Sequence, residues 1–132
     1  MGKQYAPIPE EINKITGEII GAAMAVHTEL GPGLLESVYE ICLTKELQSK
    51  GLRVERQLPV PVTYRGEQLE VGFRVDLLVE GKVVVELKAI EKILPIHEAQ
   101  VLTYLKLTNQ RLGLLLNFNV VSMQDGIKRV AL

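Results

Sequence analysis

Residues 76–88 read DLLVEGKVVVELK, two apolar runs that are separated by Glu80-Gly81. Short apolar runs on either side of a glycine-containing turn predict a β-hairpin. We expect its strands to cover about residues 69–79 and 82–87. A single hairpin is not stable alone in water, so the flanking segments must supply more strands and the helices that cover them.

The length of the hairpin loop decides which side chains face each other. A two-residue turn would leave Asp76 facing away from Glu86. A three-residue loop pairs Val79 with Val83 when Gly81 is in a left-handed conformation, which glycine adopts at low cost. In that register Asp76 lies directly opposite Glu86, and we predict this register.

Two helices are expected before the hairpin. From Glu10 onward, apolar residues recur every three or four positions, which is typical of a helix, and Gly31-Pro32-Gly33 ends it. A second helix is expected over about residues 34–50. Its expected apolar face includes Leu35, Val38, Cys42 and Leu47, so we predict that the Cys42 thiol is buried and structural.

The remaining segments complete a sheet. Residues 53–64 read as an irregular strand, and two prolines within it predict an edge position. Residues 96–109 predict a helix, the apolar run 112–118 is typical of a buried parallel strand, and residues 127–132 predict a final edge strand. The order αα-βββ-α-β-β predicts an α/β fold, a mixed central sheet flanked by helices. We expect one domain over residues 1–132, with residues 1–9 as a leader arm.

Composition restricts the function classes. The chain has 132 residues, is 47% hydrophobic and carries a formal net charge of −1. These values suit a globular protein, and they give it no overall basic field of the kind that many nucleic-acid-binding proteins carry. One cysteine excludes an internal disulfide and a cysteine-based zinc site. Without a signal peptide or an apolar run of roughly 20 residues, we expect a cytoplasmic protein with no membrane contact.

Three ionisable groups around the hairpin point to chemistry. Glu86 and Lys88 are two residues apart, so they share one face of the strand, and the predicted register brings Asp76 to them. Two carboxylates at that distance repel each other, and a bound Mg²⁺ would compensate their charge. Lys88 could then orient or deprotonate a water, or hold a phosphate. Taken alone, the same residues also fit a hairpin with solvated charges, in which Lys88 forms a salt bridge.

Further motifs surround this pattern. Residues 26–32 read VHTELGP, residues 33–39 read GLLESVY, and residues 97–104 read HEAQVLTY. With these motifs and the Asp76, Glu86-Leu-Lys88 set, the chain resembles the GxxExxY family of the PD-(D/E)XK nuclease superfamily from about residue 10 to its C-terminal strand. The resemblance implies a restriction-endonuclease-like core.

The resemblance also implies roles for individual residues. Asp76 and Glu86 would bind Mg²⁺, for which Mn²⁺ can substitute, with the Leu87 carbonyl as a further ligand. Lys88 would be the catalytic lysine. Glu36 would be an additional acidic residue that reaches the metal. The resemblance further assigns catalytic roles to Gln100 and Tyr104, and a substrate contact to Tyr39.

The role of Arg74 and the function of the chain each have more than one interpretation. Arg74 shares a strand face with Asp76, so it would either bind a substrate phosphate or neutralise the carboxylates. The leading hypothesis is a metal-dependent nuclease that cuts DNA or RNA, with a homodimer as one source of specificity. The rival hypothesis is a non-catalytic module that keeps the fold and binds protein or nucleic acid. A hydrolase that acts on a small phosphorylated molecule is a weaker third hypothesis.

Overall fold

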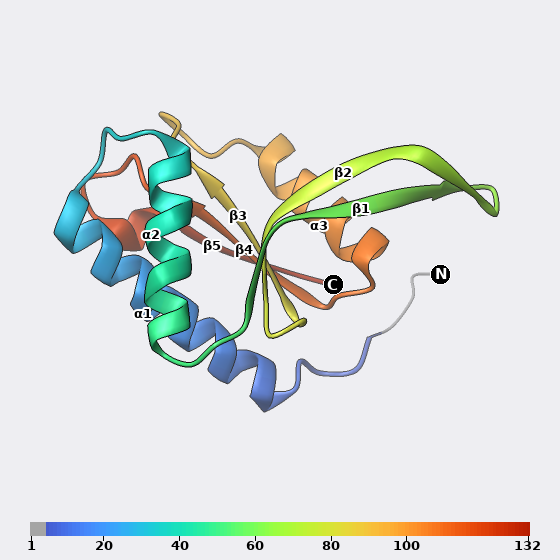
Figure 1. Cartoon of the computed structure of the whole chain (residues 1–132), viewed down its shortest axis with the longest axis horizontal. Helices are drawn as coiled ribbons and strands as arrows, with labels where there is room; N and C mark the ends of the chain where they lie inside the picture. The colour runs from blue at the N-terminus through green and yellow to red at the C-terminus, as the bar shows by residue number, and fades with distance from the viewer. Residues whose placement is uncertain (1–4) are drawn as a thin grey trace.

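The computed structural model describes residues 5–132, in which three α-helices and five strands follow one another in the predicted order (Figure 1). Residues 1–4 of the expected leader arm lie outside the described part, and residues 5–9 precede the first helix without regular structure. The elements are α1 (Glu10–Leu30), α2 (Glu36–Ser49), β1 (Val54–Tyr64), β2 (Glu67–Val79), β3 (Val83–Lys88), α3 (Pro95–Thr108), β4 (Leu112–Asn117), a short 3-10 turn (Met123–Gly126) and β5 (Ile127–Ala131).

The five strands form one mixed sheet in the order β1-β2-β3-β4-β5. β3 and β4 are parallel, and the other neighbouring pairs are antiparallel. β1 and β5 are the two edges, as the prolines of β1 and the position of β5 in the chain predicted. The structure confirms the α/β fold with a mixed sheet between helices, which is the restriction-endonuclease-like arrangement.

Helices cover both faces of the sheet (Figure 1). Val83, Val85 and Leu87 of β3 belong to the core that α1 and α2 complete. Val84 points to the opposite face and packs in a second core with residues of α3. β4 is buried along its whole length, which explains why its sequence is a continuous apolar run rather than an alternating one. None of the helices within residues 5–132 has both the length and the apolar character that a bilayer crossing requires.

The predicted apolar face of α2 was correct at Leu47 but wrong at Leu35, Val38 and Cys42. The core-facing apolar residues are Tyr39, Leu43 and Leu47, whereas Leu35 precedes the helix and is 74% exposed. The true face is therefore rotated by one position, or about 100° around the helix axis. Polar residues on the same side of α2 are also buried, so the buried face is not marked by apolar residues alone. The partners of these polar residues come from other elements or from the helix backbone. Val38 and Cys42 are half-buried, so Cys42 is not the fully buried thiol that we expected.

The pairing of β1 with β2 breaks opposite Asp76. Arg56 pairs with Leu77 and Leu58 pairs with Val75, but the intervening Gln57 has a φ of +49° and is not paired. The register is the same on both sides of Gln57, so the break inserts no extra residue. Val75 packs in the α3 core, whereas Leu77, only two residues later, packs in the α1–α2 core. Beyond this point the β1–β2 hairpin extends away from the body of the molecule as an arm (Figure 1).

Candidate active site

The β2–β3 hairpin has the predicted register. Val79 pairs with Val83 across a three-residue loop, and Gly81 is left-handed with a φ of +64°. Glu80 is also left-handed, with a φ of +54°, which the sequence did not indicate. Extending the paired register by one residue beyond the Leu77–Val85 pair puts Asp76 opposite Glu86. The loop length therefore brings the two carboxylates together.

The two acidic residues are connected through each other's backbone. The Asp76 amide donates a hydrogen bond to Glu86 Oε1 at 3.1 Å. The Leu87 amide donates to Asp76 Oδ2 at 2.9 Å. These bonds replace regular strand pairing at the end of the β2–β3 ladder and orient both carboxyl groups toward a common space.

Burial makes the charge of this pair costly. Glu86 is only 5% exposed. Its burial, and then the nearby negative charge of Asp76, raise the pKa of Glu86 to about 8. Without a cation, the pair therefore retains a proton at neutral pH. A positive ion that replaces this proton would allow both carboxylates to be charged.

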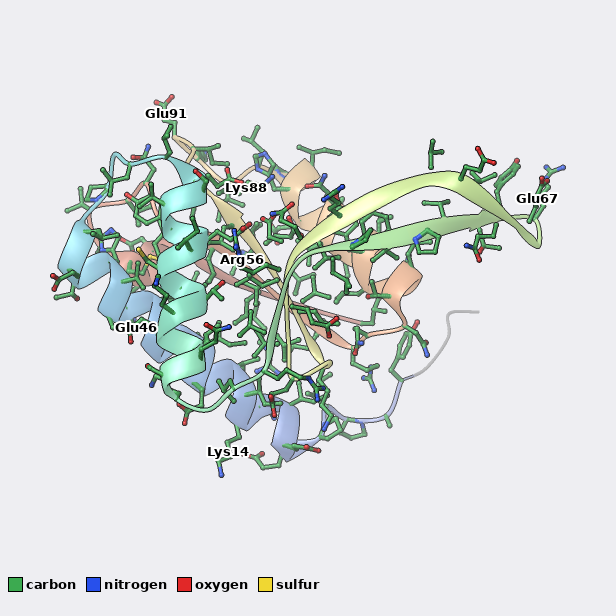
Figure 2. All side chains as sticks on the ribbon, viewed as in Figure 1. Lys14, Glu46, Arg56, Glu67, Lys88 and Glu91 are labelled. Carbon is green, nitrogen blue, oxygen red and sulfur yellow. The ribbon has the colours of Figure 1, made fainter. Side chains whose placement is uncertain are left out.

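Lys88 is half-buried at the end of β3 (Figure 2). Its positive charge lowers the pKa values of Glu86 and Glu36, although burial and Asp76 outweigh this effect in both cases. Within residues 5–132, however, its ammonium group forms no hydrogen bond or ion pair. The salt bridge that the alternative interpretation required is therefore absent, and the ammonium group is available to another partner.

Hydrogen bonds from the end of β4 fix the backbone at and after Lys88. The Phe118 amide donates to the Lys88 carbonyl at 2.9 Å. The buried Asn117 accepts a hydrogen bond from the Ile90 amide at 3.1 Å and donates one to the Ile90 carbonyl at 2.9 Å. These contacts fix the backbone from which the Lys88 side chain projects.

Glu36 is the first residue of α2 and is exposed. Partial burial of its carboxyl group raises its pKa, and the charge of Asp76 raises it further. The charge of Lys88 and a hydrogen bond from the Ala89 amide act in the opposite direction. The fold thus brings Glu36 close to Asp76 and Lys88, as the resemblance implied.

Gln100 and Tyr104 approach from α3. Burial raises the pKa of Tyr104, the charges of Glu86 and Asp76 raise it further, and a hydrogen bond with Gln100 opposes them. The Tyr104 ring stacks on Phe73 of β2, with 4.3 Å between ring centroids. Both α3 residues therefore lie on the side of α3 that faces the carboxylates.

The structure does not support the expected substrate contact of Tyr39. The side chain has no exposed surface and stacks on Phe118, with 4.6 Å between ring centroids. Its hydroxyl donates to the Gly31 carbonyl at 2.7 Å and accepts a hydrogen bond from the Leu34 amide at 3.1 Å. Tyr39 therefore holds the turn between α1 and α2, and this turn precedes Glu36.

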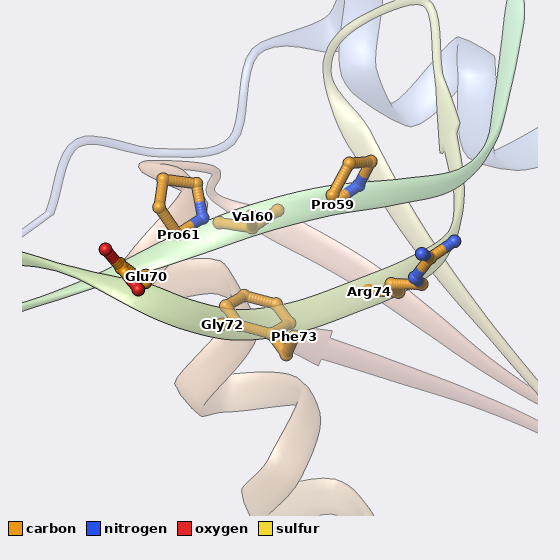
Figure 3. Close-up of a pocket in the computed structure, with 7 residues that line it drawn as sticks. All are labelled: Pro59, Val60, Pro61, Glu70, Gly72, Phe73 and Arg74. Atoms are coloured by element: carbon orange, nitrogen blue, oxygen red, sulfur yellow. The ribbon is translucent and has the colours of Figure 1, made fainter.

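Arg74 is exposed and forms no ion pair with Asp76 or Glu86 within the described part of the chain. The ion pair that would neutralise the carboxylates is therefore not observed within the described part of the chain. Arg74 lies at one end of a pocket of about 300 Å³ on the arm, with Glu70 at the other end (Figure 3). The pocket is also lined by Pro59, Val60, Pro61, Gly72 and Phe73.

Three residues beside the site were missed by sequence reasoning. Gln57 Nε2 donates to Asp76 Oδ1 at 3.3 Å and to Glu40 Oε1 at 2.6 Å. Arg56 Nη2 donates to the other oxygen of Glu40 at 3.0 Å. Glu40 lies one helical turn after Glu36, which is a weak signal in the sequence. Nothing in the sequence connects α2 to the start of β1, because that contact forms only in the folded chain.

The oxygen donors fit a hard divalent cation. Asp76, Glu86 and the Leu87 carbonyl offer only oxygen, and Mg²⁺ usually takes one or two carboxylates together with waters and substrate oxygens. Among residues 5–132, no three His, Cys, Asp or Glu side chains are gathered as a ready metal cluster. The set therefore fits an ion that keeps several waters, rather than one that is enclosed entirely by protein.

Comparison with known proteins gives one match. A family model described as the PD-(D/E)XK nuclease superfamily matches residues 13–130, which is most of the chain. No curated protein matches, and no solved structure matches. The matched range includes every residue of the candidate site, so the family likeness and the site geometry concern the same part of the chain.

Proposed function

Because the chain belongs to the PD-(D/E)XK nuclease superfamily, we propose that it is a metal-dependent nuclease that hydrolyses phosphodiester bonds in DNA or RNA. Nucleases of this superfamily generally depend on a divalent metal and act on nucleic acid. The observation that carries the proposal is the buried Glu86 next to the half-buried Asp76, with Lys88 beside them and unpaired within residues 5–132. A hairpin with solvated charges would expose these groups or pair them.

In this proposal Mg²⁺ is held by Asp76, Glu86 and the Leu87 carbonyl, and Mn²⁺ can take its place. Glu36 reaches the ion through water, which suits its exposed position at the start of α2. When bound, the ion supplies positive charge that stabilises the phosphate and acidifies a water. The raised pKa of Glu86 supports a cation here, because Glu86 otherwise keeps a proton at neutral pH.

The remaining residues act on the water and the phosphate. Lys88 orients the attacking water or holds the scissile phosphate with its free ammonium group, and Gln100 and Tyr104 assist from α3. Water attacks phosphorus, the bond to the leaving oxygen breaks, and a proton is delivered to that oxygen. Arg74 binds a neighbouring phosphate of the nucleic-acid backbone, which is supported by its exposure and by the absence of an ion-pair partner in the part of the chain that the structure describes.

The finer assignments are also part of the proposal. The motif at residues 33–39 supports the GxxExxY family within the superfamily. We further propose that the chain acts as a homodimer, because a second copy would enlarge the surface for a nucleic acid. Light scattering coupled to gel filtration would measure the oligomeric state. A monomer at micromolar concentration would remove the dimer without affecting the nuclease proposal.

The direct test is Lys88→Ala in a cleavage assay with Mg²⁺ on single- and double-stranded DNA and RNA. We expect the variant to fold with nearly unchanged stability, because the Lys88 ammonium group has no hydrogen-bond or ion-pair partner among residues 5–132, and to lose cleavage. Lys14→Ala is the matched control, since Lys14 is an exposed lysine on α1, far from Lys88 in Figure 2. Unchanged cleavage by Lys88→Ala would contradict the lysine role.

Metal binding is tested separately by titration calorimetry with Mn²⁺. We expect the parent to bind Mn²⁺ and Asp76→Asn to lose that binding. A parent that neither binds Mn²⁺ at millimolar concentration nor cleaves any of the four substrates would instead favour the non-catalytic binding module.

A further inference from the structure

We propose that Gln57 is a positioning residue, which fixes the carboxylate of Asp76 through an amide bridge anchored on Glu40. This inference rests on the proposed function, in which Asp76 is a metal ligand. Gln57 and Glu40 are outside the set that the family resemblance implied, and neither reaches the reacting atoms in this proposal. Their effect on metal binding is exerted through Asp76.

The bridge consists of one amide group between two carboxylates. Gln57 Nε2 donates to Asp76 Oδ1 at 3.3 Å and to Glu40 Oε1 at 2.6 Å. An amide nitrogen carries two hydrogens, so it can serve both acceptors at once. The opposite orientation of the amide would place its oxygen against two carboxylates, which is electrostatically unfavourable. The donor assignment is therefore the one that the surroundings require.

Glu40 is a rigid anchor because it is buried and held from its other side. Its side chain is 8% exposed. Arg56 contacts Glu40 Oε2 through Nη2 at 3.0 Å and through Nε at 3.3 Å, which leaves Oε1 to Gln57. Pairing and hydrogen bonding of this kind offset the free-energy cost of burying a carboxylate. Hydrogen bonds thus connect Arg56 to Glu40 and Glu40 to Gln57 without a gap.

The backbone at Gln57 supports a dedicated role. Its φ of +49° lies in the left-handed region, which is unfavourable for a residue other than glycine. This conformation interrupts the β1–β2 pairing at the position opposite Asp76. The interruption allows the Gln57 amide to reach the two carboxylates. A regular strand residue there would have continued the ladder.

The consequence is that both oxygens of Asp76 are held. Oδ2 accepts from the Leu87 amide at 2.9 Å, and Oδ1 accepts from Gln57. With one bond alone, the carboxylate could rotate about its terminal torsion, which is a soft one. With two bonds, its remaining lone pairs have fixed directions. A metal ligand oriented in this way binds without a further loss of rotational freedom.

The test variant is Gln57→Gly. Glycine removes the amide and also relieves the left-handed backbone, so the variant should fold at least as well as other side-chain deletions would. Asn109→Gly is the matched control. It also replaces an amide side chain with glycine at a positive φ, here +57° at the C-terminal end of α3, and that side chain forms no hydrogen bond within residues 5–132.

Mn²⁺ affinity is measured by titration calorimetry for the parent and both variants. Loss of a hydrogen-bond partner of a metal ligand typically weakens metal binding 10- to 100-fold, and we expect about 10-fold for Gln57→Gly. The Asn109→Gly variant should bind as the parent does. A Gln57→Gly variant with the parental affinity would overturn the positioning role while leaving the metal site intact.

A metal-free measurement separates this inference from the proposed function. Crystal structures of the parent and Gln57→Gly, both without a divalent ion, would show whether the Asp76 carboxylate rotates or becomes disordered in the variant. A rotated or disordered carboxylate supports the positioning role, even if the parent binds no Mn²⁺ and the nuclease proposal fails. An Asp76 carboxylate that is ordered and unmoved in the variant overturns it, whatever the parent binds.

Discussion

Replacing Glu86 with glutamine should remove a large pH dependence from the stability of this protein. Burial raises the pKa of Glu86 in the folded chain to about 8, against an ordinary value of 4.5. The folded state therefore binds a proton more tightly than the unfolded state does. The stability that this proton contributes is fully present below about pH 4.5 and is lost as the pH rises through about 8.

The expected magnitude follows from the same shift. One pKa unit corresponds to about 1.4 kcal/mol, so between about pH 5 and about pH 8.5 the Glu86 contribution should fall by on the order of 4 kcal/mol. Glutamine resembles the protonated carboxyl group: its oxygen can accept the hydrogen bond from the Asp76 amide, and its nitrogen can donate to the Asp76 carboxylate. The variant should therefore keep nearly constant stability where the parent weakens.

The assay is urea unfolding of the parent and Glu86→Gln at the two pH values, without a divalent metal. The difference between the two proteins isolates Glu86 from other groups that titrate in this range. Adding Mg²⁺ at about pH 8.5 should stabilise the parent by about 2.7 kcal/mol when its concentration is 100 times the dissociation constant, and it should stabilise the variant much less. Parallel pH profiles for the two proteins would refute the reasoning.

Three further predictions concern packing. Tyr39→Phe keeps the ring stacked on its aromatic partner but leaves a backbone donor and acceptor without the hydroxyl, so thermal denaturation should show a loss of about 1–3 kcal/mol, with cleavage per folded molecule unchanged. A selective loss of cleavage would restore a substrate role. Leu43→Ala should cost about 2–5 kcal/mol and Cys42→Ala much less in urea unfolding, and equal costs would contradict the observed face of α2. Gly113→Ala would place a Cβ 2.8 Å from Val101 Cγ1, so we expect a loss of about 1–3 kcal/mol by the same measurement, whereas an unchanged midpoint would show that α3 yields easily.

Much of the fold could be predicted from the sequence because its signals are local. The turn at Glu80-Gly81, the prolines of β1 and the apolar run of β4 each act on their own segment, and each prediction was confirmed. The hairpin register was predictable for the same reason, since a glycine that can adopt a positive φ sets the loop length. That register alone placed Asp76 opposite Glu86.

The face of α2 could not be predicted because tertiary partners decide it. Glu40 and Thr44 are polar but buried: Glu40 is compensated by Arg56 and Gln57, and the Thr44 hydroxyl donates to the Glu40 carbonyl at 2.8 Å. In the sequence these residues read as solvent-facing, so the apolar stripe was assigned one position away. A buried polar side chain can be recognised only when its partner is known.

The sequence by itself determined the element order, the hairpin register and the Asp76, Glu86 and Lys88 set, since these follow from the local geometry of turns and strands. Tertiary structure alone decided that Glu86 is buried and has a raised pKa, because burial depends on which other segments pack against it. It also decided the bridge from Glu40 to Asp76 through Gln57, which joins α2, β1 and β2. Such contacts connect residues far apart in the chain, and no local pattern of residues encodes them.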